Sequence, residues 1–417
     1  MNFKFYKGEE MNEKQLNLGL QYLEMEFGRD QVKGAIKNVK KFKVEIPSWI
    51  FGDFGGGRFG EYTPPGYARD IKEKLDDAAY INQLTGAADQ IATHVLWDFS
   101  EDGLTGSYEI AEKVKGEASD RGIKLGSINP TYFLKGSHRG SLSALEKKTR
   151  SNYIEQTLLA AKIAQNLAIG VVALWLPDGS NYPGQVELRK TIDLTRNSLS
   201  ELADKIDKKV RVLIEYKVFE PGTYSTILSD WGSAYLLAKE FGPNAGVLID
   251  MGHHHHTANI EQIVARLISD GIYGGFHFNT RYAADDDHSV EPNPEMARIF
   301  YELLVGEVIG NDNPEKDWDY MIDQCSGREN RMHAILHSID SLQISLAKAS
   351  LVNQHLLTKY QKEDEIILAN RLFNDALLNA DVRPIVAAAR LEKDLPENPI
   401  TVYIESGYQR KIEKERD

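Results

Sequence analysis

The amino-acid sequence predicts an α/β protein whose centre is a (β/α)8 barrel, with an N-terminal helical segment before it and a C-terminal helical extension after it. Eight short apolar stretches alternate with helical patterns, and several of these patterns end at Gly, the usual C-terminal stop of a helix. Strands that are apolar on both faces are typical of a parallel sheet covered by helices. The count of eight favours closure into a barrel, and the 417 residues exceed the roughly 250 that such a barrel needs.

The elements are expected in a simple order along the chain. Residues 12–40 are charged, with apolar residues at helical spacing, and predict one or two helices in an N-terminal segment at 1–41. The barrel is expected to span residues 42–330. Its strand candidates are, in order, 42–49, 92–99, 125–129, 170–179, 210–217, 246–253, 274–279 and 319–324. Its helical patterns are 69–86, 152–170, 187–206, 233–242 and 259–271.

Two further segments stand out by their composition. The Gly-rich residues 52–62 precede no helix, so we interpret them as a loop rather than a phosphate-binding turn. No Gly-x-Gly-x-x-Gly follows the first strand candidate, which argues against a dinucleotide-binding sheet. After about residue 330 the strand patterns stop, and residues 331–417 are expected to form the helical extension. The Leu- and Ala-rich patterns there carry more apolar surface than one barrel flank needs, which predicts packing against another subunit.

Charge and cysteine content exclude several classes of protein. The formal net charge is −13, which repels nucleic acid and anionic membranes and is compatible with a neutral substrate and divalent cations. Only Cys325 is present, so no intrachain disulfide can form and a reducing compartment is favoured. The first residues lack the apolar region of a signal peptide, and no stretch approaches the ~20 apolar residues of a membrane span. We therefore expect a cytoplasmic protein that binds neither nucleic acid nor membrane.

Polar side chains recur where the predicted strands of the second half end. Glu215 and Asp250 each follow a Val-Leu-Ile run, His277 lies in GGFHFN, and Asp323 follows Tyr-Met-Ile. A parallel barrel brings such strand-end residues together around one mouth. His253 lies three residues beyond Asp250, on the loop that leaves the same strand. Carboxylates and imidazoles gathered in this way predict a divalent-metal site.

Three adjacent carboxylates at residues 285–287 extend the predicted site. Asp285 and Asp287 can point the same way in an extended segment, so we prefer them to Asp286 as ligands; a solvated acidic turn is the alternative. Two divalent ions together with Lys217 would balance the five carboxylates of the site, whereas one ion would leave it strongly anionic. Glu215 would then bridge the two ions. Oxygen and imidazole ligands without thiolate suit Mn²⁺, Co²⁺ or Mg²⁺ better than Ca²⁺ or structural Zn²⁺.

The remaining candidates each have an ordinary structural alternative. The run His253-His254-His255-His256 resembles an engineered metal tag or a surface run, and only its first member has the Asp-x-x-His register. Lys217 shares a strand face with Glu215, where it could stabilise a substrate oxygen or make a simple ion pair. Near the ends of the second and fourth strands lie three residues that could face a sugar or fill the core, namely His94, Trp97 and Trp175. Cys325 is expected to be a small core residue.

With these residues in place, the chain resembles the L-rhamnose isomerases, in the branch that acts on several rare aldoses. More loosely, it is similar to the xylose isomerase-like TIM barrels. The resemblance extends from about residue 55 to 330, and its specificity lies in the ordered series of motifs. They are RFG (58–60), THVLWD (93–98), LWLPDGSNYPGQ (174–185), EYK (215–217), YSTILSDWGSAYLLAKE (224–240), LIDMGHH (248–254), GGFHFN (274–279), the Asp run and MIDQ (321–324).

The resemblance implies a role for each candidate residue. It implies a structural metal held by Glu215, Asp250, His277 and Asp323. It implies a catalytic metal held by Glu215, His253, Asp285 and Asp287. The implied substrate contacts are His94, Trp97, Trp175, Lys217 and, in an apolar wall, Phe59. Among all of these we expect catalytic roles for Lys217, Asp285, Asp287 and His94. The family is homotetrameric, and a neighbouring subunit contributes an aromatic side chain that Tyr132 or Phe133 could match.

From this resemblance we predict a reversible aldose–ketose isomerase that uses two divalent ions, with Mn²⁺ as first choice. L-rhamnose and L-rhamnulose are the leading substrate pair, with hydride transfer from C2 to C1 and proton transfer from O2 to O1. An enediol route with a carboxylate base is the alternative mechanism. One alternative function is the isomerisation of another rare aldose such as D-allose or L-mannose. Two others are a metal-dependent endonuclease and a non-catalytic sugar-binding barrel. The net charge disfavours the endonuclease.

Overall fold

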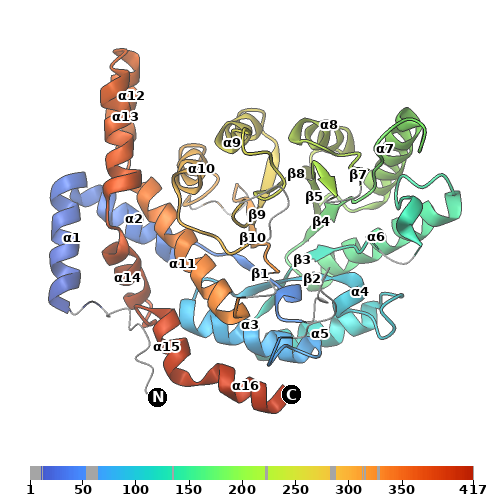
Figure 1. The fold of residues 1–417 in the computed structure, drawn as a ribbon, viewed down its shortest axis with the longest axis horizontal. Coiled ribbons are helices and arrows are strands. Elements are labelled where there is room, and N and C mark those ends of the chain that lie inside the picture. Colours follow the sequence, from blue (N-terminus) through green and yellow to red (C-terminus); the bar gives the residue numbers. More distant parts are fainter. Residues whose placement is uncertain are drawn as a thin grey trace.

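The computed structural model describes residues 11, 13–52, 64–133, 136–220, 224–281, 288–311, 313, 316–325 and 329–416. Eight parallel strands form a closed barrel surrounded by helices, as the sequence predicts (Figure 1). The barrel strands are β1 (Glu45–Pro47), β2 (Gln90–His94), β3 (Lys124–Asn129), β4 (Val171–Trp175), β5 (Arg211–Glu215), β8 (Ala245–Asp250), β9 (Tyr273–Phe278) and β10 (Asp319–Ile322). Each pairs with its neighbours in chain order, and β1 closes the ring against β10.

The barrel strands are buried almost along their whole length, which explains why most of them are rich in apolar residues in the sequence. All six residues of β8 are buried, as are the last five of β9 and the last four of β5. The pairing register sets Trp175 beside Glu215 and Asp250 beside His277. Because all strands run the same way, these terminal residues lie at one mouth of the barrel.

Helices follow the strands and cover the outside of the barrel. They are α3 (Ile71–Thr85), α5 (Tyr108–Asp120), α6 (Lys147–Leu167), α7 (Leu188–Lys205), α8 (Trp231–Phe241), α9 (Ile260–Ser269) and α10 (Pro294–Val305). Side-chain caps start several of them; Asp230 accepts from Ser233 N and Asn293 accepts from Met296 N. The five expected patterns are confirmed. We did not predict α5 and α10, although Asn293 followed by Pro294 is a typical helix start.

Seven of the eight predicted strands extend beyond the observed carboxyl ends, and only the third, 125–129, ends where its strand does. The segment 92–99 leaves the sheet after His94 and forms a short helix, α4 (Val95–Asp98). The cause is Asp98, whose carboxylate accepts from His94 N at 2.9 Å and from Ser48 Oγ at 2.6 Å and pairs with Lys74 Nζ at 2.7 Å. These bonds turn the chain back, so that Trp97 lies on α4 rather than on a strand.

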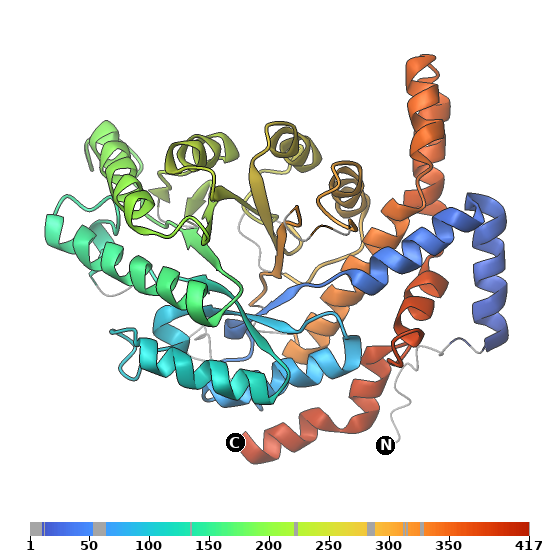
Figure 2. The same cartoon turned by 180° about the vertical axis from the view of Figure 1, so that it is seen from behind.

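Helices before and after the barrel pack together on one of its flanks. They are α1 (Glu13–Phe27), α2 (Arg29–Lys41), α11 (Arg331–Ser350), α12 (Gln354–Lys362), α13 (Ile366–Asn374), the π-helix η4 (Asp375–Asn379), α14 (Arg383–Leu391), α15 (Pro399–Ser406) and α16 (Tyr408–Arg416). Helix α11 contacts both α10 and α3, so it fills the remaining place in the ring of barrel helices. Helix α2 lies between α11 and α14, and α14 also contacts α1, so helices from both ends of the sequence pack on this flank (Figure 2).

Helices α12 and α13 pack against each other and project away from the barrel (Figure 1). Ile366, Ile367 and Leu368 are exposed where α13 begins, and Leu18, Tyr22 and Met25 form an exposed apolar stripe on α1. Within the described ranges, every helix is too short or too polar to cross a bilayer.

Candidate active site

Four residues that follow or end neighbouring strands form a compact cluster at the mouth of the barrel. Glu215, Asp250, His277 and Asp323 each offer one ligand atom, and these atoms lie within 4.8 Å of one another. Glu215 ends β5, Asp250 ends β8, His277 lies next to last in β9, and Asp323 follows β10. The first three are buried, and the side chain of Asp323 is 18% exposed. We call this group the strand-end cluster.

Polar atoms of this cluster face one another without completing hydrogen bonds. His277 Nδ1 lies 3.3 Å from Glu215 Oε1, 3.3 Å from Asp323 Oδ2 and 3.7 Å from Asp250 Oδ2. Both His277 Nδ1 and Asp250 Oδ2 are buried and lack a hydrogen-bond partner among the described residues. Such atoms are costly to bury unpaired. Three carboxylates and one imidazole converging on one point fit a divalent cation, which would satisfy both atoms.

His253 lies beside the cluster, on the loop after β8. Its Nδ1 lies 3.0 Å from the Tyr216 carbonyl oxygen and 3.2 Å from Glu215 Oε1, and its Nε2 lies 4.0 Å from Asp250 Oδ1. Donation from Nδ1 to the Tyr216 carbonyl selects the tautomer in which Nε2 is the basic nitrogen. Metal-binding histidines commonly donate the N–H of one ring nitrogen to a backbone carbonyl in this way, which leaves the other nitrogen free to bind the metal.

Burial and mutual attraction move the pKa values of this cluster in opposite directions. Burial raises the pKa of Asp250 to about 6, with the carboxylates of Asp323 and Glu215 adding to the shift. Burial also acts to raise the pKa of Glu215, but the neighbouring His277 and His253 hold it well below its usual range. Burial opposes protonation of His277, yet Glu215 and Asp323 raise its pKa well above the usual value. The cluster therefore favours a positive charge at its centre.

The strand-end cluster opens into a cavity of about 370 Å³. Glu215, His253, His277 and Asp323 are on one side of it, and aromatic and polar side chains form the rest. These other lining residues are Trp49, His94, Trp97, Asn129, Pro130, Phe133, Ala173, Trp175, Pro177, Lys217, Glu220, Tyr224 and Cys325. Among the described residues, the four predicted substrate contacts, His94, Trp97, Trp175 and Lys217, all line the same cavity.

Aromatic rings form a continuous wall of this cavity. Ring centroids are 4.1 Å apart for His94 and Trp97, 5.4 Å for Trp97 and Phe133, and 5.1 Å for Phe133 and Trp175. Burial lowers the pKa of His94 to about 4, so its imidazole is neutral at pH 7. Lys217 Nζ lies 5.0 Å from the Trp175 ring centroid. Apolar faces combined with a few polar groups are typical of small-molecule sites.

Several residues that line the cavity were not predicted from sequence, and Trp49, Glu220, Tyr224 and Cys325 are among them. Trp49 Nε1 donates to Asp323 Oδ1 at 3.1 Å, and Glu220 pairs with Lys217 at 3.0 Å. Trp49 ends the first strand candidate, so the expectation that residues at strand ends gather at the barrel mouth could have identified it. Tyr224 lies on the small antiparallel pair β6 (Phe219–Glu220) and β7 (Tyr224–Ser225), which no strand pattern indicated. Cys325 lines the cavity as well as packing in the core, so the interpretation as a plain core residue was incomplete.

Other predicted positions lie elsewhere or outside the described residues. Phe59, Asp285 and Asp287 fall outside them. Phe133 lines the cavity of its own chain, and the buried Tyr132 hydroxyl contacts Thr157 Oγ1 at 2.6 Å.

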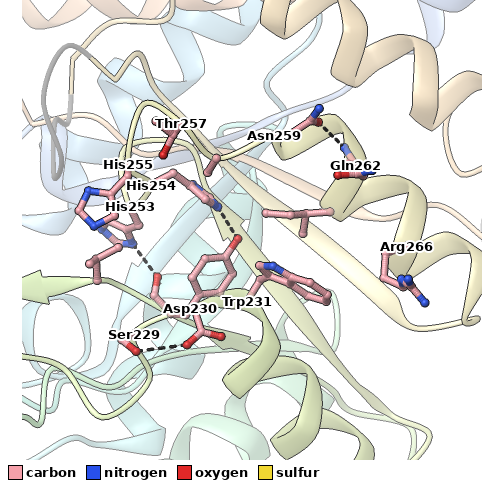
Figure 3. A pocket seen from close by; sticks show the side chains of 14 residues that line it. Ser229, Asp230, Trp231, His253, His254, His255, Thr257, Asn259, Gln262 and Arg266 are labelled. Carbon is pink, nitrogen blue, oxygen red and sulfur yellow. Dashed lines mark hydrogen bonds between the residues drawn. The ribbon is translucent and has the colours of Figure 1, made fainter.

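A second cavity of about 580 Å³ lies on the other side of His253, between the first turns of α8 and α9 (Figure 3). Asp230, Trp231 and Arg266 line it together with part of the His run. His254 is buried, with Nε2 2.5 Å from the Tyr216 hydroxyl, whereas His255 and His256 are exposed. Burial lowers the pKa of His254 to about 3, so it is a neutral packing residue.

Comparisons with known proteins agree with this fold. The family model described as a xylose isomerase-like TIM barrel matches residues 83–323. A protein of Rhizobium meliloti (strain 1021), named a probable sugar isomerase, is 34% identical over 392 residues, covering 92% of this chain and 88% of that protein. An L-rhamnose isomerase of Listeria monocytogenes serotype 4b (strain F2365) is 23% identical over 365 residues, covering 80% and 82%.

Among solved structures, an L-ribulose 3-epimerase superposes with a TM-score of 0.51 at 13% sequence identity. The match covers 78% of this chain and 98% of that one, and at this identity it shows the shared fold alone. The family match spans more than half of the chain, and the Rhizobium relative is similar over nearly all of it. The chain belongs to the xylose isomerase-like TIM barrel family.

Proposed function

We propose that the protein is a metal-dependent aldose–ketose isomerase, with L-rhamnose and L-rhamnulose as the leading substrate pair. The observation that carries the proposal is the buried strand-end cluster, which opens directly into a cavity walled by aromatic rings and the Lys217 ammonium. Relatives named sugar isomerases support the class of reaction, and the more distant L-rhamnose isomerases support the choice of sugar.

Two divalent ions, with Mn²⁺ as first choice and Co²⁺ or Mg²⁺ as alternatives, complete the proposed centre. Glu215, Asp250, His277 and Asp323 would hold one ion, and Glu215, His253, Asp285 and Asp287 would hold the other. When bound, the ions supply Lewis acidity, which makes a coordinated hydroxyl more acidic and stabilises charge on a neighbouring oxygen.

The side chains of the cavity have separate roles in this proposal. Hydride passes from C2 to C1 of the open-chain aldose while a proton moves from O2 to O1, which converts the aldehyde to a hydroxymethyl group and C2 to a ketone. Asp285 and Asp287 orient the water that carries the proton, and Lys217 donates a hydrogen bond to the oxygen on which charge develops. Neutral His94 hydrogen-bonds a sugar oxygen. Trp97, Trp175 and the apolar wall that includes Phe59 keep bulk water from the reacting carbons.

We also propose that the active form is a cytoplasmic homotetramer. The exposed apolar residues of α1 and of the α12–α13 projection support contacts between copies, because contiguous apolar surface of this kind usually marks an interface. Light scattering coupled to size-exclusion chromatography measures the assembly directly. A mass of one chain, 47.0 kDa, would refute this part of the proposal without affecting the chemistry.

The experiment that tests the function is an aldose panel including L-rhamnose, L-mannose and D-allose. It is assayed before chelation, after chelation and after adding back Mn²⁺, with Lys217→Ala and Asp323→Asn alongside. The proposal expects turnover that chelation abolishes and Mn²⁺ restores. Activity that survives both chelation and Asp323→Asn would refute the metal mechanism, and sugar binding without conversion would indicate a binding protein. Loss of a C2 label to solvent would favour an enediol route over hydride transfer.

A further inference from the structure

Three side chains that line the cavity lie at or beyond the carboxyl ends of three neighbouring strands. The barrel strands alone therefore do not fix the positions of these side chains relative to one another. Phe133 follows β3, Trp175 ends β4, and Lys217 follows β5. The Phe133 and Trp175 rings lie 5.1 Å apart, and Lys217 Nζ lies 5.0 Å from the Trp175 ring centroid. A sugar in the cavity contacts all three groups only if the loops after β3, β4 and β5 are held together.

Asp178, three residues beyond Trp175, joins the first two of these loops. Its side chain is buried, and it accepts hydrogen bonds from four neutral donors on the loop after β3. Oδ1 accepts from Ser141 N and Ser141 Oγ, both at 2.8 Å. Oδ2 accepts from Ser143 N at 3.0 Å and Ser143 Oγ at 2.7 Å, and Ser141 N also lies 2.7 Å from it. A carboxylate offers enough lone pairs for all four donors.

The backbone of the same residue joins the loop after β5. The Asp178 carbonyl accepts from Ile227 N at 2.9 Å, and Ser180 N donates to the Ser225 carbonyl at 2.9 Å. The contact is so close at Gly179 that an added Cβ would lie 2.1 Å from the Ser225 carbonyl oxygen. Two separate segments of chain therefore pack here backbone to backbone.

This segment of the β5 loop holds Lys217 in turn. Lys217 N donates to the Leu228 carbonyl at 2.9 Å, and Thr226 Oγ1 donates to the Lys217 carbonyl. A continuous series of hydrogen bonds thus runs from Ser141 through Asp178 and the residues at 226–228 to Lys217. No member of this series other than Lys217 lines the cavity.

We propose that Asp178 is a positioning residue for the substrate cavity. It sets sugar affinity and the choice among aldoses by holding the loops that carry Phe133 and Lys217 at fixed positions beside Trp175. The inference rests on the proposed sugar isomerase function. In Asp178→Asn one oxygen becomes an amide nitrogen. The serine hydroxyls can rotate to accept from that nitrogen, and Ser141 N and Ser143 N can share the remaining oxygen, but the bonds to that oxygen lose the negative charge that makes them about twice as strong. The loop after β3 then shifts relative to Trp175, and small displacements in a binding site are costly.

The test compares Asp178→Asn with Asp204→Asn, the same change at an exposed position on α7. KM and kcat are measured on the aldose panel together with the Mn²⁺ dissociation constant and the midpoint of thermal unfolding. We expect KM of Asp178→Asn to rise about tenfold and the ratio of kcat/KM between aldoses to change. The Mn²⁺ constant stays within about twofold, because Glu215 is held within β5 itself and Asp250, His277 and Asp323 come from the ends of β8, β9 and β10.

A lower midpoint of unfolding with unchanged KM and unchanged aldose ratios would overturn the inference, since it would show a structural role only. Should Asp178→Asn not fold, Ser141→Ala and Ser143→Ala remove single hydroxyl donors and keep both backbone bonds. These variants should raise KM by a smaller factor, and an unchanged KM in both would also overturn the inference. A wild-type protein that converts no aldose would refute the proposed function itself, a result distinct from either outcome.

Discussion

Asp250 and His277 occupy paired positions on β8 and β9, and the carboxylate oxygen Oδ2 of the first lies 3.7 Å from Nδ1 of the second. Both atoms are buried, and neither has a hydrogen-bond partner among the described residues. Parallel pairing in this register is what turns two residues 27 positions apart in the sequence into neighbours at the barrel mouth. A cation between them would satisfy both atoms, so the residues that hold or support this pair should control metal affinity.

Trp49→Phe is expected to weaken metal binding although Trp49 is not a ligand. The substitution removes the indole N–H that donates to Asp323 Oδ1 at 3.1 Å, and such supporting bonds typically change metal affinity by about 10- to 100-fold. Isothermal titration with Mn²⁺ measures the change. Trp231→Phe is the matched control, because that ring lines the second cavity, and its Mn²⁺ affinity should equal that of the wild type. Equal affinity in Trp49→Phe would contradict the role given to this bond.

Lys217→Ala is expected to lower kcat about 10²- to 10³-fold, because it removes a positioned donor to the oxygen that gains charge. The Mn²⁺ affinity should change little, since Lys217 is not a predicted ligand and its ammonium pairs with Glu220 and lies near the Trp175 ring. Steady-state kinetics on the best aldose provides the measurement, with exposed Lys190→Ala as control. A Lys217→Ala variant with wild-type kcat would show that Lys217 has no catalytic role.

Glu45 is expected to make stability depend on pH near neutrality. Burial, with a smaller effect of Asp319, raises the pKa of this carboxyl from 4.5 to about 7, although the bonds from Ser127 N and Oγ oppose the shift. The folded state therefore binds more protons than the unfolded state between these values. The favourable contribution is fully present below pH 4.5 and is lost as pH rises through about 7, with a total on the order of 3 kcal/mol.

Glu45→Gln tests this directly, because the amide resembles the protonated acid. Free energies of unfolding at pH 5 and pH 8 are measured by denaturant titration for both proteins. The wild type should lose more stability than the variant between the two values. Parallel losses in both proteins would show that Glu45 does not titrate there.

The eight strands could be predicted because burial on both faces leaves mostly apolar residues in them, most clearly in β4 and β5. Their ends could not be placed as well, because strand termination depends on distant partners. Asp98 ends the second strand through bonds to Ser48 and Lys74, neither of which is near in sequence. Helix α5 was missed since only Ala111, Val114 and Ala118 of it are buried, which is a weak apolar pattern.

The strand-end residues could be named from sequence because barrel topology decides their neighbours. Glu215, Asp250, His277 and Asp323 are brought together by parallel register alone. Trp49 and Glu220 were missed because their roles depend on the side-chain partners Asp323 and Lys217, which a linear pattern does not show. The proposed roles of Phe59, Asp285 and Asp287 remain predictions from the resemblance, since these residues lie outside the described part of the chain.

The most direct test of the central claim is Mn²⁺ binding to the wild type and to His277→Ala, measured by titration calorimetry on chelator-treated protein. Removal of the imidazole whose Nδ1 faces three carboxylates should abolish binding at one site or weaken it by more than about tenfold. Sugar turnover should fall with it. A wild type that binds no divalent ion, or a variant that binds Mn²⁺ as tightly as the wild type, would contradict the account.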